Sequence, residues 1–316
     1  MALITLILGA GLGKQYGFPD GPELRKLIIN ALPDHDRNLR EIIEVSTAET
    51  VDEIAARYPN HADQIRRIVT QILREREDEA KVLQNDTPNT YKLMLKQIAA
   101  AQIKGDTVKI FTFNYDRSLQ YLLHRVNAIE SQERRIDTGI ITPIYGRLAP
   151  LFFEDPDRNR PMAHHDYGPK ELKLTFRDSD DEEDRQADHR RLEQDNLDKL
   201  CRASNLFFIG EAKAPKNTEL GIILENSDQI YFMGVGYHKA NMEVLNFDFT
   251  KGYPGKIIAG TGFNLSSHEI KFLMEQYPSI NKIESCDAFT FLKTKFDISD
   301  PAKNILNRPV TSVNGL

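Results

Sequence analysis

Uninterrupted apolar runs that end in glycine or in polar residues mark the strands expected from the sequence. The run 3–8 (LITLIL) is apolar or β-branched throughout, which is typical of a parallel strand buried on both faces. Strands of the same kind are expected at 107–113, 136–144, 205–210, 229–234 and 256–260, with one more near Ile283. Since helical segments separate these runs, the pattern predicts an α/β fold with a Rossmann-like, doubly wound parallel sheet.

Helical periodicity fills the interval between the first two strands. In 23–31 the apolar residues fall on one face, and from 40 to 101 the pattern is helical almost throughout, without an internal repeat. We therefore expect a helical insertion at 40–101, after the first strand.

A change of composition marks a second insertion at 150–199, which contains the acidic run 178–184. Such a run is typical of a solvated segment, and a docking surface for a basic partner is the alternative. We expect one domain over 1–300 that includes both insertions, followed by a C-terminal tail at 301–316.

Composition narrows the class of protein. The 316 residues are 40% hydrophobic, enough for a core without disulfides, and Cys201 and Cys286 are too few for a disulfide framework or a four-cysteine zinc site. No metal is therefore expected, and a reducing cytoplasm is the expected compartment. The sequence shows no signal peptide and no run long enough to cross a membrane. A net charge of −6 argues against direct binding to nucleic acid.

The first motif is Gly9-Ala10-Gly11, directly after the first strand. Glycines there allow a tight turn and let the backbone approach a diphosphate. The next glycine, Gly13, is misplaced for the usual dinucleotide fingerprint, so a plain tight turn is the alternative.

The second motif is Thr112-Phe113-Asn114-Tyr115-Asp116, at the end of a buried strand. Polar side chains at such a place are unfavourable unless they bind a ligand or cap the following helix. Capping accounts for Asp116 alone, whereas two polar side chains around a tyrosine favour a ligand site.

The third motif begins with Gly234 and Gly236 and continues through Tyr237 to Asn241. Glycine for close approach, followed by an aromatic ring and an amide, is compatible with a loop that binds adenosine. A turn followed by a capped helix is the alternative.

In this order, and with Gly17 and Pro19 after the first turn, the three motifs resemble the sirtuin signature. The resemblance covers roughly 3–290 and is strongest to the sirtuin-like domains of bacterial antiphage defence proteins. It implies a Rossmann-type domain that hydrolyses NAD to nicotinamide and ADP-ribose, thereby depleting cellular NAD on phage infection. It also implies a homo-oligomer or a complex with another defence protein. Protein-deacetylating sirtuins carry a four-cysteine zinc ribbon, which two cysteines cannot build.

The resemblance also implies roles for individual residues. Asn114 would hold the attacking water or the ribose hydroxyls, and Asp116 would orient the ribose or the nicotinamide end. The residues expected to bind NAD are Gly9, Ala10, Gly11, Gly17, Pro19, Thr112, Gly234, Gly236, Tyr237 and Asn241.

One position departs from the family. Where sirtuins carry a catalytic histidine before glycine, this chain has Tyr145, and a phenol with a pKa near 10 is a poor general base at neutral pH. Either Tyr145 only positions the ribose, or catalysis is lost, or one of His164, His165 and His238 replaces the histidine. A non-hydrolysing NAD or ADP-ribose sensor and a structural subunit are therefore the competing interpretations.

Overall fold

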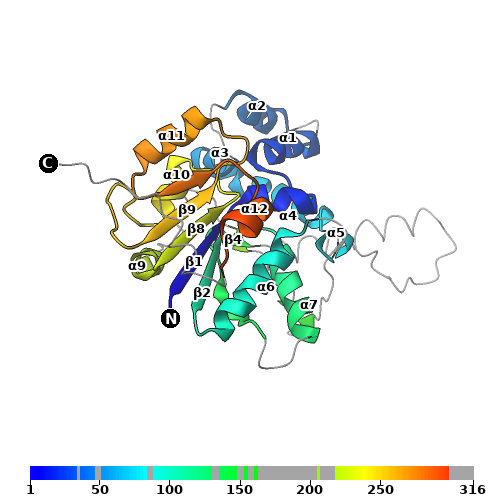
Figure 1. Cartoon of the computed structure of the whole chain (residues 1–316). Coiled ribbons are helices and arrows are strands. Elements are labelled where there is room, and N and C mark those ends of the chain that lie inside the picture. The colour runs from blue at the N-terminus through cyan, green and yellow to red at the C-terminus, as the bar shows by residue number, and fades with distance from the viewer. Residues whose placement is uncertain are drawn as a thin grey trace.

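A computed structural model of the chain describes residues 1–33, 36–46, 51–77, 79–83, 88–129, 135–147, 153–155, 160–162, 205–206 and 218–298. One parallel sheet has the strand order β10-β9-β8-β1-β2-β3 (Figure 1). Its strands are β1 Leu3–Leu8, β2 Thr107–Thr112, β3 Ile141–Pro143, β8 Gln229–Met233, β9 Ile257–Thr261 and β10 Lys282–Glu284. This is the strand order of dinucleotide-binding sheets, so the predicted Rossmann-like α/β fold is confirmed.

Two short antiparallel pairs accompany the main sheet. β4 (Gly146–Arg147) pairs with β7 (Asn205–Leu206), and β5 (Phe153–Asp155) pairs with β6 (Arg160–Met162). The strand expected at 205–210 is therefore described only at its first two residues, and these pair with β4 instead of joining the parallel sheet.

The helical insertion after β1 is also confirmed. The helical elements between β1 and β2 are η1 Ala10–Tyr16, α1 Gly21–Ala31, α2 Arg37–Val45, α3 Val51–Arg57, η2 Pro59–His61, α4 Ala62–Glu75, α5 Glu79–Leu83 and α6 Thr90–Ile103, and those from α2 onward correspond to the insertion expected at 40–101. The later helical elements are α7 Ser118–Ile129, η4 Thr138–Ile140, α9 Thr218–Asn226, α10 Lys239–Val244, α11 Ser267–Gln276, α12 Ala288–Thr290 and η5 Phe291–Lys295. Among the described residues, none of the helices has the length and apolar character needed to cross a bilayer.

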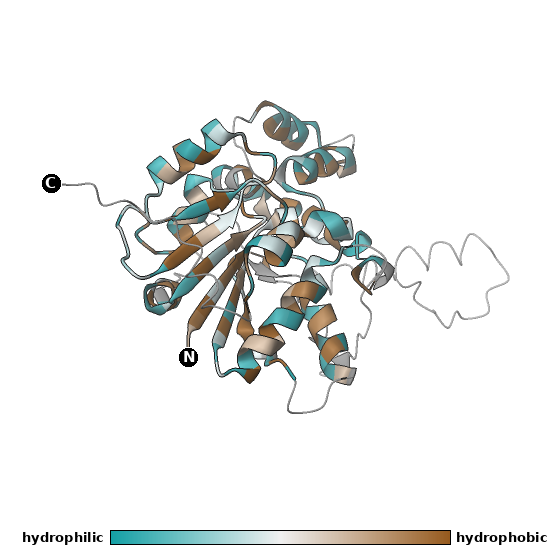
Figure 2. Cartoon of the chain, viewed as in Figure 1, coloured by the Kyte–Doolittle hydropathy of each residue, from teal (hydrophilic) through white to brown (hydrophobic). Residues whose placement is uncertain are grey.

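Both faces of the sheet are buried, which explains why its strands are apolar at successive positions. Leu6 and Leu8 of β1 pack into a core shared with the insertion, α6, α7 and α12. Ile7, Phe111 and Phe232 point to the opposite face, into a second core with residues of α9 and α10. In Figure 2 the strands are accordingly mostly brown, with some teal and white positions, between helices whose outer positions are largely teal.

The loops after β1 and β8 lie back to back at the centre of the carboxyl edge. The Gly9 amide donates to the Met233 carbonyl and the Gly11 amide to the Gly234 carbonyl, both at 3.0 Å. A side-chain carbon on Gly9 would overlap the Gly234 carbonyl oxygen. Because the sheet order reverses between these two strands, the loops flank the crevice where ligands of such sheets bind. The glycines allow the two loops to pack directly against each other.

Gly234 allows a test of this packing. Its φ is +64°, and a side-chain carbon would lie 2.6 Å from the Leu12 nitrogen. Gly234→Ala should therefore lower the free energy of unfolding in urea by roughly 2–4 kcal/mol, since left-handed strain and a backbone clash add. Gly252→Ala is the control: nothing lies within 4 Å of that position, so the change should be below about 0.5 kcal/mol. Equal effects of the two substitutions would contradict this account.

Candidate functional site

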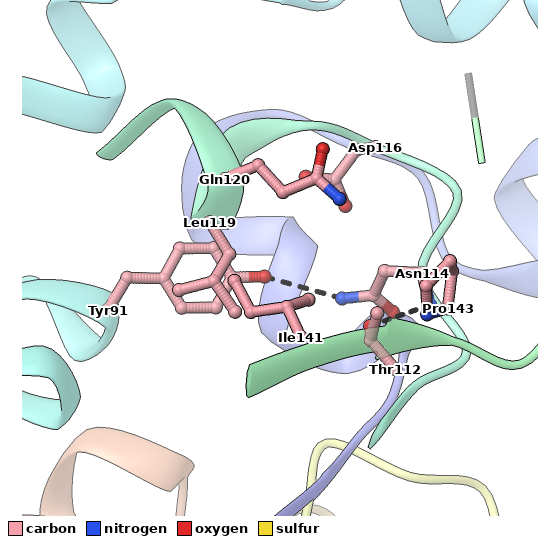
Figure 3. Close-up of a pocket in the computed structure, with 8 residues that line it drawn as sticks. All are labelled: Tyr91, Thr112, Asn114, Asp116, Leu119, Gln120, Ile141 and Pro143. Atoms are coloured by element: carbon pink, nitrogen blue, oxygen red, sulfur yellow. Dashed lines mark hydrogen bonds between the residues drawn. The ribbon is translucent and has the colours of Figure 1, made fainter. Parts of the chain in front are cut away.

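A small pocket lies at the carboxyl end of β2, one strand from the crevice (Figure 3). Its volume of about 10 Å³ is room for about one water molecule. It brings together three residues predicted from the sequence, Thr112, Asn114 and Asp116, with Tyr91 of α6. The complete lining is Tyr91, Thr112, Asn114, Asp116, Leu119, Gln120, Ile141 and Pro143.

Asn114 is the most constrained polar side chain of this pocket. It is 7% exposed, its backbone amide donates to Thr112 Oγ1 at 3.0 Å, and its Nδ2 donates to the Tyr91 hydroxyl at 3.3 Å. Its Oδ1 is buried and accepts no hydrogen bond from the described residues. A buried acceptor without a partner is unfavourable by about 1–3 kcal/mol. The Asn114 carbonyl therefore gains from a water or ligand that donates to it.

Tyr16 holds Tyr91 in place through its ring and its hydroxyl. Tyr91 is 1% exposed and stacks on Tyr16 of η1, with ring centroids 4.6 Å apart. The Tyr16 hydroxyl donates to Asn89 Oδ1 at 2.8 Å and accepts from the Tyr91 amide at 3.0 Å. Asn89 also accepts from the Lys92 amide and so caps α6. The stacked rings of Tyr16 in η1 and Tyr91 in α6 thus connect the helical segment after β1 with the polar segment after β2.

Asp116 has a structural role and an unusual electrostatic environment. Its Oδ1 accepts from the Ser118 amide at 2.9 Å, at the start of α7, which is the capping alternative considered above. Its Oδ2 lies beside Gly13 of η1. Desolvation by burial raises the pKa of Asp116, and the nearby Glu77 carboxylate raises it further. The ionised form of Asp116 is therefore poorly compensated in the folded protein.

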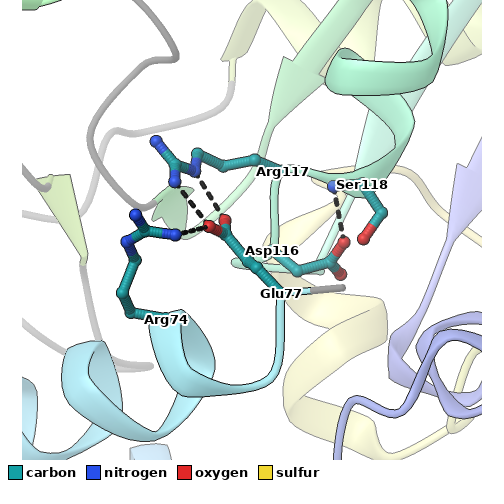
Figure 4. Close-up of polar contacts among 5 residues, drawn as sticks. All are labelled: Arg74, Glu77, Asp116, Arg117 and Ser118. Atoms are coloured by element: carbon teal, nitrogen blue, oxygen red, sulfur yellow. Dashed lines mark hydrogen bonds and ion pairs between the residues drawn. The ribbon is translucent and has the colours of Figure 1, made fainter. Parts of the chain in front are cut away.

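An ion-pair network of Glu77, Arg117 and Arg74 lies beside Asp116 (Figure 4). The Arg117 guanidinium donates from Nε to Glu77 Oε1 and from a terminal nitrogen to Oε2, each at 2.6 Å. Arg74 donates to the same Oε2 at 2.6 Å. Glu77 and Arg117 are each 1% exposed. This network is not predictable from the sequence, because Glu77 and Arg74 stand in an ordinary run of alternating charges.

The environment of Asp116 predicts a stability effect that depends on pH. A folded-state pKa above the unfolded value means that stability is lost as pH rises through the folded pKa. Asp116→Asn keeps an acceptor for Ser118 and removes the charge. The variant should therefore melt at a higher temperature than the parent at pH 7, and at the same temperature below about pH 3.5.

Asp20→Asn is the control of opposite sign. Burial alone would raise the pKa of Asp20, but the hydrogen bond from Lys14 lowers it, and the net pKa is below the ordinary value. The Asp20 carboxylate therefore stabilises the fold at pH values above its ordinary pKa. Asp20→Asn should lower the melting temperature at pH 7 and have no effect in acid. If Asp116→Asn is also destabilised at neutral pH, the Asp116 carboxylate is better compensated than its surroundings indicate.

Tyr145 lies apart from this pocket. It is buried in the second core, on the other face of the sheet, where its ring packs on Phe113 with centroids 5.4 Å apart. His238 is exposed at the start of α10, and His164 and His165 lie outside the described residues. No histidine is among the described residues that line the pocket.

The loop after β8 carries the third motif, from Gly234 to Asn241. Two side chains expected to bind the nucleotide, those of Tyr237 and Asn241, instead form hydrogen bonds within the protein. The Tyr237 ring is buried and its hydroxyl donates to the Thr261 carbonyl at 3.1 Å, while burial raises the pKa of this phenol. Asn241 Nδ2 donates to the Gly236 carbonyl at 2.9 Å. Gly236 itself is exposed. The structure therefore gives Tyr237 and Asn241 a role in shaping this loop.

Gly17 and Pro19 link the first turn to α1. Gly17 ends η1 with φ +90°, a conformation that glycine adopts without strain. Pro19 directly precedes Asp20, whose side chain caps α1. Among the residues that the structure describes, no group of three or more His, Cys, Asp or Glu side chains could hold a metal ion.

Comparison with known proteins gives structural similarities only. No protein-family model and no curated protein sequence matches the chain. It is similar to a solved Sir2 homologue in complex with NAD, at 14% identity and a TM-score of 0.45, over 96% of this chain and 90% of the other. A mutant Sir2 homologue with ADP-ribose matches at 13% and 0.43, over 98% and 94%. A Sir2 complex with a p53 peptide and NAD⁺ matches at 14% and 0.44, over 92% and 90%. At these values the assignment of the site depends on the chain's own residues.

Proposed function

We propose that the chain is an NAD glycohydrolase whose reaction centre is the pocket beside Asn114. The observation that carries this proposal is Asn114, which lines the pocket and whose buried Oδ1 accepts no hydrogen bond from the described residues. An acceptor left in this state, next to the crevice of a Rossmann-like sheet, suits a ribose hydroxyl or a water that attacks the ribose.

The reaction breaks one bond and forms one. The bond between ribose C1′ and the nicotinamide nitrogen breaks, its electron pair stays on that nitrogen, and a cationic sugar develops. Water then adds to C1′ and loses a proton, which yields nicotinamide, ADP-ribose and H⁺. Since the leaving group is already cationic, acid assistance is unnecessary, and positioning and electrostatics supply the catalysis.

Asn114 and Asp116 divide this task. Asn114 orients the water or the ribose hydroxyls through Oδ1. Asp116, which lacks full compensation for its negative charge, stabilises the developing cation and is itself stabilised by it. Tyr145, on the other face of the sheet, contributes through the packing of Phe113, the residue next to Asn114. A mechanism based on positioning tolerates tyrosine where sirtuins carry histidine.

The rest of NAD would extend along the carboxyl edge of the sheet, past the turn after β1 to the loop after β8. The Gly9 and Gly11 amides are engaged with Met233 and Gly234, so these glycines shape the turn. The exposed Ala10 and Gly236 are the places where backbone is accessible to a diphosphate or an adenosine.

In the cell we propose an antiphage effector that depletes NAD, as a homo-oligomer or with a second defence protein, because the motifs resemble that group of sirtuin-like domains. Thr112 and the motif residues Gly17, Pro19, Tyr237 and Asn241 then support the nucleotide site. The alternative is a sensor that binds NAD or ADP-ribose without turnover, favoured by the absence of a histidine from the described pocket.

The test is nicotinamide release from NAD by the purified chain, with NAD and ADP-ribose binding measured by calorimetry on the same samples. Turnover at a rate proportional to enzyme concentration is the expected result. Binding without turnover would select the sensor, and the absence of both would select a structural subunit.

A further inference from the structure

We propose that the pocket beside Asn114 takes a single water molecule as the acceptor of the ADP-ribosyl group, and that Gln120 sets this limit. The reaction itself rests on the proposed function. The limit rests on the size of the pocket and on the residues that line it. It implies a hydrolase that discriminates against transfer of ADP-ribose to acceptors larger than water.

The volume of the pocket determines what fits into it. It is about 10 Å³, which is room for about one water, so a methyl group attached to that oxygen would overlap the wall. A buried water needs about two to four polar partners. The lining includes Thr112, Asn114, Asp116 and Gln120, whose side chains all carry polar groups. The pocket therefore suits one water and excludes an alcohol or an amine that carries a carbon chain.

Gln120 is placed to set this size. It lies in the first turn of α7, whose start is capped by Asp116, so both side chains lie at the same end of that helix. Figure 3 shows the Gln120 side chain extending from α7 toward Asp116. Thr112, Asn114 and Leu119 are buried, whereas Gln120 is half-buried. Gln120 therefore lies where the pocket approaches the solvent, and its side chain occupies space that a larger acceptor would need.

Methanol is the probe of this limit, because it is a water molecule with one hydrogen replaced by a methyl group. If methanol replaces water, its oxygen bonds to ribose C1′ and the bond between C1′ and the nicotinamide nitrogen breaks. Nicotinamide leaves with the electron pair of that bond, and the methanol oxygen releases its proton. The product is then methyl ADP-ribose in place of ADP-ribose.

Gln120→Ala truncates the side chain at Cβ and opens the pocket. In buffer that contains methanol, the ratio of methyl ADP-ribose to ADP-ribose should be at least about 10-fold higher in this variant than in the parent, because forcing a methyl group into filled space is unfavourable by that factor or more. Since the ratio compares two products of one enzyme, it is independent of any change in the overall rate. Equal ratios in the parent and in Gln120→Ala would overturn the role of Gln120.

Two control variants separate the volume of Gln120 from its other properties. Gln120→Met keeps the length of the side chain without the amide, so it should give the parental ratio. Gln71→Ala truncates an exposed glutamine on α4, away from the pocket, and should also leave the ratio unchanged. The same rise in Gln120→Met as in Gln120→Ala would overturn the proposal, because the pocket would then not select by size.

The closing experiment does not depend on activity. Crystals of the parent and of Gln120→Ala, grown without nucleotide, are soaked in methanol. The parent should show density for one water in the pocket, and Gln120→Ala should show methanol there. Methanol in the parent, an empty parental pocket, or water alone in both proteins would overturn the proposal. Failure of the parent to release nicotinamide would overturn the proposed function and leave the crystallographic result intact.

Discussion

Asn114→Ala is expected to lower kcat for nicotinamide release by about 100-fold or more. Among the described residues that line the pocket, Asn114 carries the one buried side-chain acceptor without a hydrogen-bond partner, and the substitution removes it. Loss of one preorganised group at a reacting centre typically lowers kcat by 10²–10³. The affinity for ADP-ribose should change far less, since the contacts that we propose for the diphosphate and the adenosine lie along other loops.

The same variant should be almost as stable as the parent. It loses a 3.3 Å hydrogen bond to Tyr91 but also removes a buried carbonyl without a partner, so the free energy of unfolding should change by less than about 1 kcal/mol. Asn226→Ala, at the exposed end of α9, is the control and should retain full activity. Retention of at least a third of parental kcat by Asn114→Ala would falsify the assignment of Asn114.

Removing one partner of the Glu77–Arg117 pair should be the most destabilising substitution of those considered. Glu77→Ala leaves the Arg117 guanidinium, 1% exposed, without its bidentate acceptor. Removal of one partner of a buried ion pair costs about 3–5 kcal/mol, and the effect is measured as the free energy of unfolding in urea. Activity should fall as well, because Arg117 directly follows Asp116 and holds the segment that carries it.

The double replacement Glu77→Leu with Arg117→Met is the informative control. It removes both charges and keeps apolar volume, so its stability should lie within about 2 kcal/mol of the parent. Arg74→Met should cost less than about 1 kcal/mol, because that side chain is partly exposed. If the double variant is as unstable as Glu77→Ala, then altered packing at this position explains the loss of stability, and the unpaired charge does not.

The sheet and the loops at its switch point were predictable because the relevant patterns are local. Continuous apolar runs indicated strands buried on both faces, and the glycines that follow β1 and β8 marked the loops at the switch point. Asn114 and Asp116 were identified because polar residues stood directly after a buried strand. These signals require no knowledge of which distant segments meet.

The partners of those residues were not predictable, because periodicity reveals which helix face is buried but not what it contacts. Tyr91 reads as the first residue of an ordinary helix, and Glu77 as one charge among several. The directions of Tyr145 and Tyr237 were equally undetermined. Beyond the end of a strand, alternation no longer fixes whether a side chain faces a ligand or the core.

The position of β1 in the sheet has a consequence for synthesis of the chain. β1 pairs with β2, where Leu3 lies opposite Thr107, and with β8, where Ile4 lies opposite Gln229. A ribosome that adds about 5–20 residues per second needs roughly 10–45 s to travel from β1 to β8. Throughout that interval the hexapeptide LITLIL has an unpaired edge, and it combines high β-propensity with no charge and no proline. We therefore expect β1 to be a binding site for chaperones during translation and the segment that most strongly limits soluble yield.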